Sequence, residues 1–158
     1  MLGKEYGKVD PAGRFKFPAA YKKQLVSIIE QGFVIRKSIF EPMLELYTYA
    51  EFENEKNKTI ARLNPYNRND RLMIRKISEG NLVELDGSDR LLIPADQKQF
   101  ANIQKNIVMN ARGNVIEIWD EKTYTDTIEK PEIDYADMFE KRLGNAENGG
   151  INNIVVTE

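Results

Sequence analysis

The sequence contains no cysteine and no histidine among its 158 residues. Disulfides, Cys/His zinc sites, thiol nucleophiles and histidine general bases are therefore excluded. No apolar run approaches the roughly 20 residues of a membrane span, and the N-terminal residues lack a signal-peptide core. We therefore expect a cytoplasmic protein with no membrane partner. Catalysis by carboxylates, lysine or tyrosine remains possible, but a chain without histidine and cysteine is a poor candidate for an enzyme. We expect no enzymatic activity, no cofactor, no metal and no small-molecule substrate.

A ten-residue pattern occurs twice, at residues 9–18 and 85–94, 76 positions apart. Each copy reads Asp, three residues, Arg, three residues, Pro, and mostly apolar residues lie between Arg and Pro. Glu45-Leu46-Tyr47 and Glu117-Ile118-Trp119 also correspond, at an offset of 72. Such self-similarity predicts two related structural units of about 45 residues each.

Each copy predicts a strand, a turn, a second strand and a short helix. Asp10-Pro11-Ala12-Gly13 fits a type I β-turn, and Pro18 suits the first position of the following helix. Thr48 precedes Glu51 by three residues, which is a capping-box pattern. The same reading along the chain predicts strands at 3–9, 14–17, 33–36, 43–47, 82–85, 90–93, 107–109 and 115–119, and helices at 19–25, 49–62, 68–78, 94–101, 121–130 and 134–143.

The chain divides into four segments by these patterns. The first repeat spans residues 4–50, a helical connector 51–80, the second repeat 81–125, and an acidic C-terminal helix with a flexible tail 126–158. A unit of this size buries little core by itself, so we expect the two repeats to share one.

The net charge of −2 hides an asymmetry between the halves. Residues 1–76 hold 15 Lys and Arg against nine Asp and Glu, whereas residues 77–158 hold eight against 16. The halves therefore carry +6 and −8, and a basic half of this kind suggests a nucleic-acid partner. The alternative is that the acidic half merely keeps the protein soluble. Arg68, Arg71 and Arg75 lie at spacings of three and four, hence on one face of the helix predicted at 68–78. This stripe is either a solvated surface or a phosphate-contacting one.

The residues of the first motif differ in what the local structure requires of them. Asp10 can accept backbone hydrogen bonds in the turn, Gly13 suits a positive φ, and Pro18 sets the helix start. A β-turn has no such need for the guanidinium of Arg14. An Arg at this position either pairs with a carboxylate of its own fold or contacts a partner.

The second motif departs from the first where Asp89 replaces glycine. Asp adopts a left-handed conformation less readily than Gly, so we expect Gly87 to supply the positive φ in a shifted register. The neighbouring carboxylates Asp86 and Asp89 are available to pair with Arg90. Together with Pro94, these features predict that the second motif is mainly structural.

The doubled Asp-x-x-Gly-Arg-x-x-x-Pro pattern, the Leu-Glu-Leu-Tyr and Ile-Glu-Ile-Trp segments and the opening Met1-Leu2-Gly3 resemble the MraZ family. These are bacterial transcription regulators with two tandem SpoVT-AbrB-type domains, and the resemblance covers about residues 1–143. It implies an α+β, mainly β fold: a double-psi or swapped-hairpin β-barrel made by two tandem β-β-α-β-type repeats with peripheral helices. It also implies ring-shaped homo-oligomers associated with the nucleoid. These would bind double-stranded DNA at direct repeats in the promoter of the division and cell-wall gene cluster, which includes the regulator's own gene.

The resemblance places the motif Arg of each repeat against DNA, which means Arg14 and Arg90 here. The basic residues around the first motif extend the expected DNA-binding set to Lys8, Lys16 and Lys22. The residues expected to shape the two motifs are Asp10, Gly13, Pro18, Asp86, Asp89 and Pro94.

Three other functions remain open from the sequence. An AbrB-like antitoxin or transition-state regulator usually carries one copy of the motif and a separate partner-binding tail. A ring protein that binds no DNA would share the fold alone. An enzyme would have to use carboxylates such as Asp86 and Asp89, which lie in a turn without a phosphate loop or metal-ligand spacing nearby.

Overall fold

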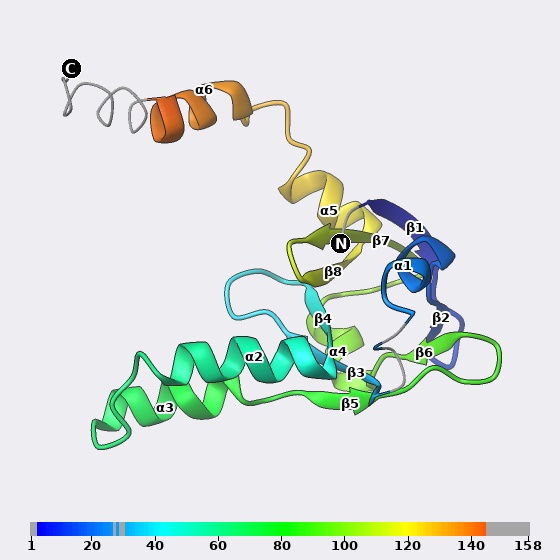
Figure 1. The fold of residues 1–158 in the computed structure, drawn as a ribbon. Helices are drawn as coiled ribbons and strands as arrows, with labels where there is room; N and C mark the ends of the chain where they lie inside the picture. The colour runs from blue at the N-terminus through cyan, green and yellow to red at the C-terminus, as the bar shows by residue number, and fades with distance from the viewer. Residues whose placement is uncertain (1–2, 27, 29–30, 145–158) are drawn as a thin grey trace. The chain divides into compact units, whose positions relative to one another are not determined.

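The computed structural model describes residues 3–26, 28 and 31–144 (Figure 1). The chain divides into two compact units, Met1–Thr123 and Tyr124–Glu158. The elements in chain order are β1 (Lys4–Lys8), β2 (Arg14–Lys16), α1 (Ala19–Gln24), β3 (Phe33–Lys37), β4 (Leu44–Thr48), α2 (Tyr49–Ile60), α3 (Arg68–Ile77), β5 (Asn81–Val83), β6 (Arg90–Leu92), α4 (Ala95–Phe100), β7 (Asn106–Arg112), β8 (Val115–Asp120), α5 (Glu121–Thr127), α6 (Tyr135–Phe139) and the π-helical turn η2 (Glu140–Gly144). Among the described helices, none combines the length and the apolar character that crossing a membrane requires.

The first unit is built on a six-stranded sheet in the order β1-β7-β8-β4-β3-β5, with every neighbouring pair antiparallel. The first strand of each repeat pairs with the hairpin of the other repeat: β1 with β7, and β5 with β3. The central pair is β4 with β8, where Glu45 lies opposite Glu117. Strands β1, β3 and β4 of the first repeat are equivalent to β5, β7 and β8 of the second. Exchanging these equivalents gives the same strand order read from the opposite edge. The two repeats are therefore related by an approximate two-fold axis between β4 and β8.

A second, two-stranded sheet pairs β2 with β6, and the two strands lie side by side in Figure 1. Its register places Phe15 opposite Leu91, which are equivalent positions of the two motifs. The approximate two-fold axis therefore also passes through the centre of this ribbon. The doubled motif of the sequence is brought together as one antiparallel pair.

The α+β class is confirmed, but the expected closed barrel is wrong, because the six-stranded sheet is open. Among the described strands, its edge strands β1 and β5 do not pair with each other, and β2 and β6 pair only with each other. Both ribbon strands are three residues long and end close to a proline, Pro18 or Pro94. Proline has no N–H to extend a ladder, so the ribbon stays too short to pair with the edge strands β1 and β5 and close the sheet into a barrel.

The core is shared by the two repeats, as expected. Phe15 and Leu91 on the inner face of the ribbon are each 1% exposed, and they belong to the same cluster as the buried side chains of the large sheet. The hydroxyl oxygen of the buried Tyr21 lies 2.8 Å from the carbonyl oxygen of Gly3 and 3.1 Å from that of Met109, so its single O–H is shared between two acceptors. Burial raises the pKa of Tyr21 to about 12, so this hydroxyl keeps its proton and remains a donor.

Most predicted helices are confirmed with small shifts at their ends. Thr48 Oγ1 accepts from Glu51 N at the start of α2, and Asp120 Oδ2 accepts from Thr123 N at the start of α5. The helix predicted to reach residue 130 ends at Thr127. In the second unit, the helix predicted at 134–143 is α6 followed by η2.

Helix α3 packs no side chain into the core. Its apolar residues Leu72 and Met73 are 56% and 46% exposed, and none of its residues is buried. The stripe of arginines on α3 is exposed as well: Arg68, Arg71 and Arg75.

Candidate nucleic-acid interface

The two motif turns have the same hydrogen-bond pattern. Asp10 Oδ1 accepts from the backbone N–H groups of Ala12 (3.0 Å) and Arg14 (2.8 Å). Asp86 Oδ1 accepts from Ser88 (2.8 Å) and Arg90 (2.9 Å) in the same way. The backbone N–H of the motif arginine lowers the pKa of each of these carboxyl groups, so both are ionised at neutral pH.

The expected role of Gly87 is wrong. Gly13 has φ +95°, and the equivalent residue Asp89 itself takes φ +59°, whereas Gly87 has no positive φ. The second turn therefore keeps the register of the first, and Asp89 adopts a left-handed conformation, which Asp tolerates better than most residues.

The motif prolines lie one position earlier than expected. Pro18 and Pro94 are the N-cap residues of α1 and α4, with extended ψ values of 135° and 144°. Their carbonyls accept the first helical N–H groups, from Tyr21 and Lys22 in α1 and from Gln97 and Lys98 in α4. Each proline therefore starts its helix from just outside it.

The outer face of the β2–β6 ribbon is basic. Directly opposed residues in a ladder share a face, and Phe15 and Leu91 occupy the inner one. The outer face therefore holds the opposed pairs Arg14–Leu92 and Lys16–Arg90. Two like charges opposite each other destabilise a ribbon, so the Lys16–Arg90 pair has no evident structural purpose.

The expected DNA-binding cations differ in their partners. Arg14 is half-buried, and its guanidinium makes no hydrogen bond or ion pair within the described part of the chain. Arg90 Nε lies 2.9 Å from Asp86 Oδ2, which bears out the expected pairing with Asp86. Lys22 Nζ lies 2.9 Å from both carboxylate oxygens of Asp89, so that carboxylate holds Lys22 and not Arg90.

The structure brings Lys8 and Lys16 together. Both are exposed, and both line a cleft of about 370 Å³ between β1 and the end of β2. Lys8 lies on β1, opposite Asn106 of β7. The surface around the first motif thus gathers Lys8, Lys16 and Arg14, while Lys22 and Arg90 are held by carboxylates of the second motif.

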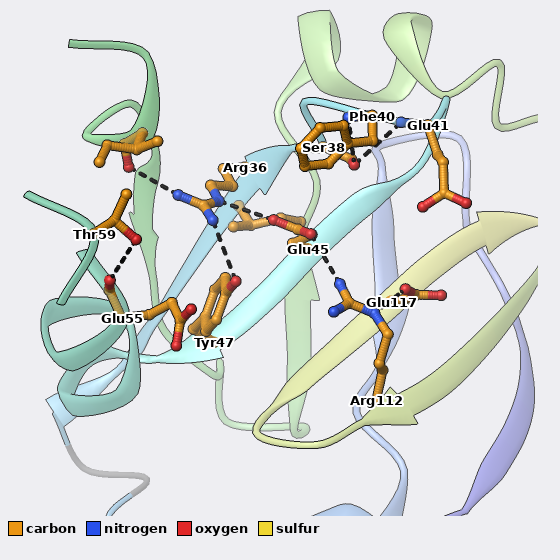
Figure 2. Close-up of polar contacts among 12 residues, drawn as sticks. Arg36, Ser38, Phe40, Glu41, Glu45, Tyr47, Glu55, Thr59, Arg112 and Glu117 are labelled. Carbon is orange, nitrogen blue, oxygen red and sulfur yellow. Dashed lines mark hydrogen bonds and ion pairs between the residues drawn. The ribbon is translucent and has the colours of Figure 1, made fainter. Parts of the chain in front are cut away.

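A polar cluster on the large sheet was not predicted from the sequence (Figure 2). Glu45 and Glu117 lie opposite each other, with side chains only 11% and 9% exposed. Arg112 Nη2 lies 3.0 Å from Glu45 Oε2, and its Nε contacts Glu117 Oε2. Arg36 Nε lies 3.0 Å from Glu45 Oε1. The signal that predicts such a cluster is the glutamate repeated in the Leu-Glu-Leu and Ile-Glu-Ile segments, which lies in the middle of an apolar strand each time.

Arg36 connects this cluster to the helices. Its Nη1 donates to the carbonyl of Ile77 at the end of α3 (2.8 Å), and its Nη2 donates to the Tyr47 hydroxyl (3.2 Å; Figure 2). The guanidinium also lies 5.4 Å from the ring centre of Phe52 in α2. Arg36 thereby attaches both connector helices to the six-stranded sheet: α2, which follows β4, and α3, which precedes β5.

The left-handed conformation of Asp89 predicts an unusual substitution series. Asp89→Ala should lower the free energy of unfolding by about 1–2 kcal/mol, because it loses the half-exposed ion pair and places an alanine at positive φ. Asp89→Gly loses the same ion pair without the conformational cost and should stay within about 1 kcal/mol of wild type. Urea denaturation of both variants tests this, and an alanine variant at least as stable as the glycine variant would contradict it.

Comparisons with known proteins agree on one family. A protein-family model described as "MraZ protein, putative antitoxin-like" matches residues 77–146. The transcriptional regulator MraZ of Christiangramia forsetii is 39% identical over 152 residues, which cover 96% of this chain and 97% of that protein. The regulator of the same name from Flavobacterium psychrophilum is 38% identical over 149 residues, or 94% of each chain. That of Bacteroides fragilis is 34% identical over 120 residues, covering 75% of this chain and 76% of its own.

Proposed function

Because the chain belongs to the MraZ family of transcriptional regulators, we propose that it binds double-stranded DNA through the outer face of the β2–β6 ribbon. In this proposal Arg14 is the leading contact. Lys16 and Lys8 support it by contacting phosphates. The chain acts as a DNA-binding regulator in the cytoplasm, at the nucleoid.

The observation that carries the proposal is the basic outer face of the ribbon. A two-stranded ribbon is one of the shapes that the major groove of DNA admits. The ribbon presents Arg14 without a carboxylate partner in the described residues, and it opposes Lys16 to Arg90. Arginine suits bidentate contacts with guanine or phosphate.

The two motifs have unequal roles in this proposal. In the first, Asp10, Gly13 and Pro18 shape the turn and helix start that present Arg14. In the second, Asp86 and Asp89 hold Arg90 and Lys22, so this motif serves mainly as the scaffold for its partner strand. We propose the same division for the chain: a DNA-reading repeat at 4–50, a connector at 51–80, a supporting repeat at 81–125 and an acidic tail at 126–158.

A ring-shaped homo-oligomer reconciles DNA binding with the acidic chain, whose isoelectric point is about 5.4. A ring displays several copies of the ribbon in register, and each copy can bind weakly while several together bind well. Its target would be direct repeats in the promoter of the division and cell-wall gene cluster, including the gene of this chain.

Two other functions compete with this proposal. The matching family model is described as antitoxin-like, which favours an AbrB-like antitoxin with a protein partner as the second candidate. Co-purification from the native cell separates it from the first, because an antitoxin retains its toxin. A structural ring that binds no DNA is the third candidate, and direct DNA binding distinguishes it from the first.

Binding to the DNA upstream of its own gene tests the proposal. Fluorescence anisotropy should show tight binding at 50 mM salt, a loss of at least tenfold by 200 mM because phosphate contacts release counterions, and weaker binding to a scrambled duplex. An oligomer that shows no salt-dependent binding to its upstream DNA would exclude this function.

A further inference from the structure

Two adjoining clefts open beside the turn of the first motif. The larger, about 540 Å³, is lined by that turn and by the start of α4, including Gly13, Leu92 and Lys98. The smaller, about 460 Å³, is lined by residues that include Lys8, Asp10 and Lys105, and it shares Pro11, Lys98 and Gln104 with the larger. The shared residues make the two one continuous hollow, which we call the lysine cleft after Lys8, Lys98 and Lys105.

The lysine cleft carries a net positive charge. Its two linings contain three lysines against one carboxylate, that of Asp10. Asp10 Oδ1 already accepts two backbone hydrogen bonds in the turn. In the part of the chain that the structure describes, the ammonium groups of Lys8, Lys98 and Lys105 make no ion pair or hydrogen bond. Three ammonium groups that share a hollow, without partners among the described residues, create a positive potential that attracts an anionic ligand.

The approximate two-fold symmetry shows what is special about Lys98. Lys98 is equivalent to Lys22, and Gly13 is equivalent to Asp89, each at an offset of 76. On one side of the axis, Lys22 is held 2.9 Å from Asp89. On the other side, Lys98 shares the cleft with Gly13, which has no side chain to neutralise it. The lysine of one copy, Lys22, is therefore neutralised by an ion pair, whereas its equivalent Lys98 faces a glycine at the position of the carboxylate.

The lysine cleft adjoins the outer face of the ribbon. Leu92 lines the cleft and lies directly opposite Arg14 in the ladder, and Gly13 lines it immediately before Arg14 in the chain. A duplex contacted by Arg14 would therefore pass one of its strands over the cleft.

We propose that the lysine cleft binds phosphates of the DNA backbone, with Lys98 and Lys105 as contacts supplied by the second repeat. This inference rests on the proposed function. It means that the reading surface of the first motif is completed by the other repeat, so residues 4–50 alone do not make up the interface. Phosphate contacts fix register and orientation without reading sequence, which leaves discrimination to Arg14.

The Lys98→Gln/Lys105→Gln variant of the full chain tests the inference, measured by anisotropy against the upstream DNA and a scrambled duplex. We expect a loss of affinity of about tenfold at 100 mM salt and a salt slope shallower by about 1–2, one unit for each lost phosphate contact. The preference for upstream over scrambled DNA should stay unchanged. The matched control is Lys58→Gln/Lys130→Gln, which removes the same charge from two exposed lysines outside the cleft and should bind like wild type.

The charge-conserving variant Lys98→Arg/Lys105→Arg should retain binding. If it also loses binding, substitution at these positions damages the fold and not the phosphate contacts, which would overturn the inference. An equal loss in the Lys58/Lys130 control would overturn it in favour of overall charge. Unchanged binding by the Gln variant, with binding lost in Arg14→Ala, would overturn the lysine cleft alone and favour an acidic protein segment as its ligand. A wild-type chain that binds no duplex would overturn both proposals.

Discussion

Replacing Arg14 with alanine should weaken binding to the upstream DNA at least tenfold, whereas Arg90→Ala should weaken it by less than about threefold. A bidentate arginine contact with guanine is worth about 1–3 kcal/mol, and 1.4 kcal/mol corresponds to tenfold. Arg14 has no competing partner in the described chain, but Arg90 must first leave Asp86, which lies 2.9 Å away. In an oligomer each copy carries the same substitution, so the loss from Arg14→Ala is repeated at every engaged ribbon.

Arg14→Lys is the matched variant for this prediction. It keeps the charge but loses the bidentate fork, so it should fall between wild type and Arg14→Ala on the upstream DNA and lose its advantage over scrambled DNA. Anisotropy titrations at one salt concentration measure all four proteins. Equal losses for Arg14→Ala and Arg90→Ala would contradict the unequal roles of the two motifs.

The local elements of this fold could be predicted from the sequence because short-range chemistry determines them. The turn at Asp10–Gly13 depends on residues within four positions, and the cap at Thr48 is a bond to the backbone N–H three residues further on. The division into two repeats was readable because Asp, Arg and Pro recur at one spacing.

Features that join distant residues could not be predicted in this way. The pairing of β1 with β7 connects positions about 100 residues apart, and nothing in either segment specifies the other. The ion pair between Lys22 and Asp89 likewise depends on the exchange of strands between repeats. The error over Gly87 has a local origin instead. Asp86 accepts from the backbone N–H groups at the same two positions as Asp10 does, which keeps the second turn in the register of the first and places Asp89 at the positive φ.

The lysine cleft illustrates this limit for function. Charge totals assign the basic character to the first half of the chain, yet Lys98 and Lys105 belong to the acidic half. They become part of the first motif's surroundings only because β6 pairs with β2 and α4 follows β6. A charge balance along the sequence therefore underestimates the basic surface that the fold assembles.

Arg112→Ala should destabilise the fold more than Asp89→Ala does, lowering the free energy of unfolding by roughly 2–3 kcal/mol. It leaves the carboxylate of Glu117, 9% exposed, with the indole N–H of Trp119 as its donor and with Glu45 opposite across the strands. Breaking a fully buried ion pair typically costs about 3–5 kcal/mol, and the smaller value follows because the Arg112 side chain is itself 56% exposed. Urea denaturation monitored by the fluorescence of the single tryptophan, Trp119, measures the loss.

The double variant Arg112→Ala/Glu117→Gln separates stranded charge from lost packing. Removing the second charge should restore at least half of the stability, because the neutral amide no longer opposes Glu45 and still accepts from Trp119. Glu117→Gln alone should cost less than Arg112→Ala, since Arg112 keeps its contact with Glu45 at 3.0 Å. If the double variant is as unstable as Arg112→Ala, the guanidinium stabilises the sheet through its packing, and the opposed carboxylates are tolerated without it.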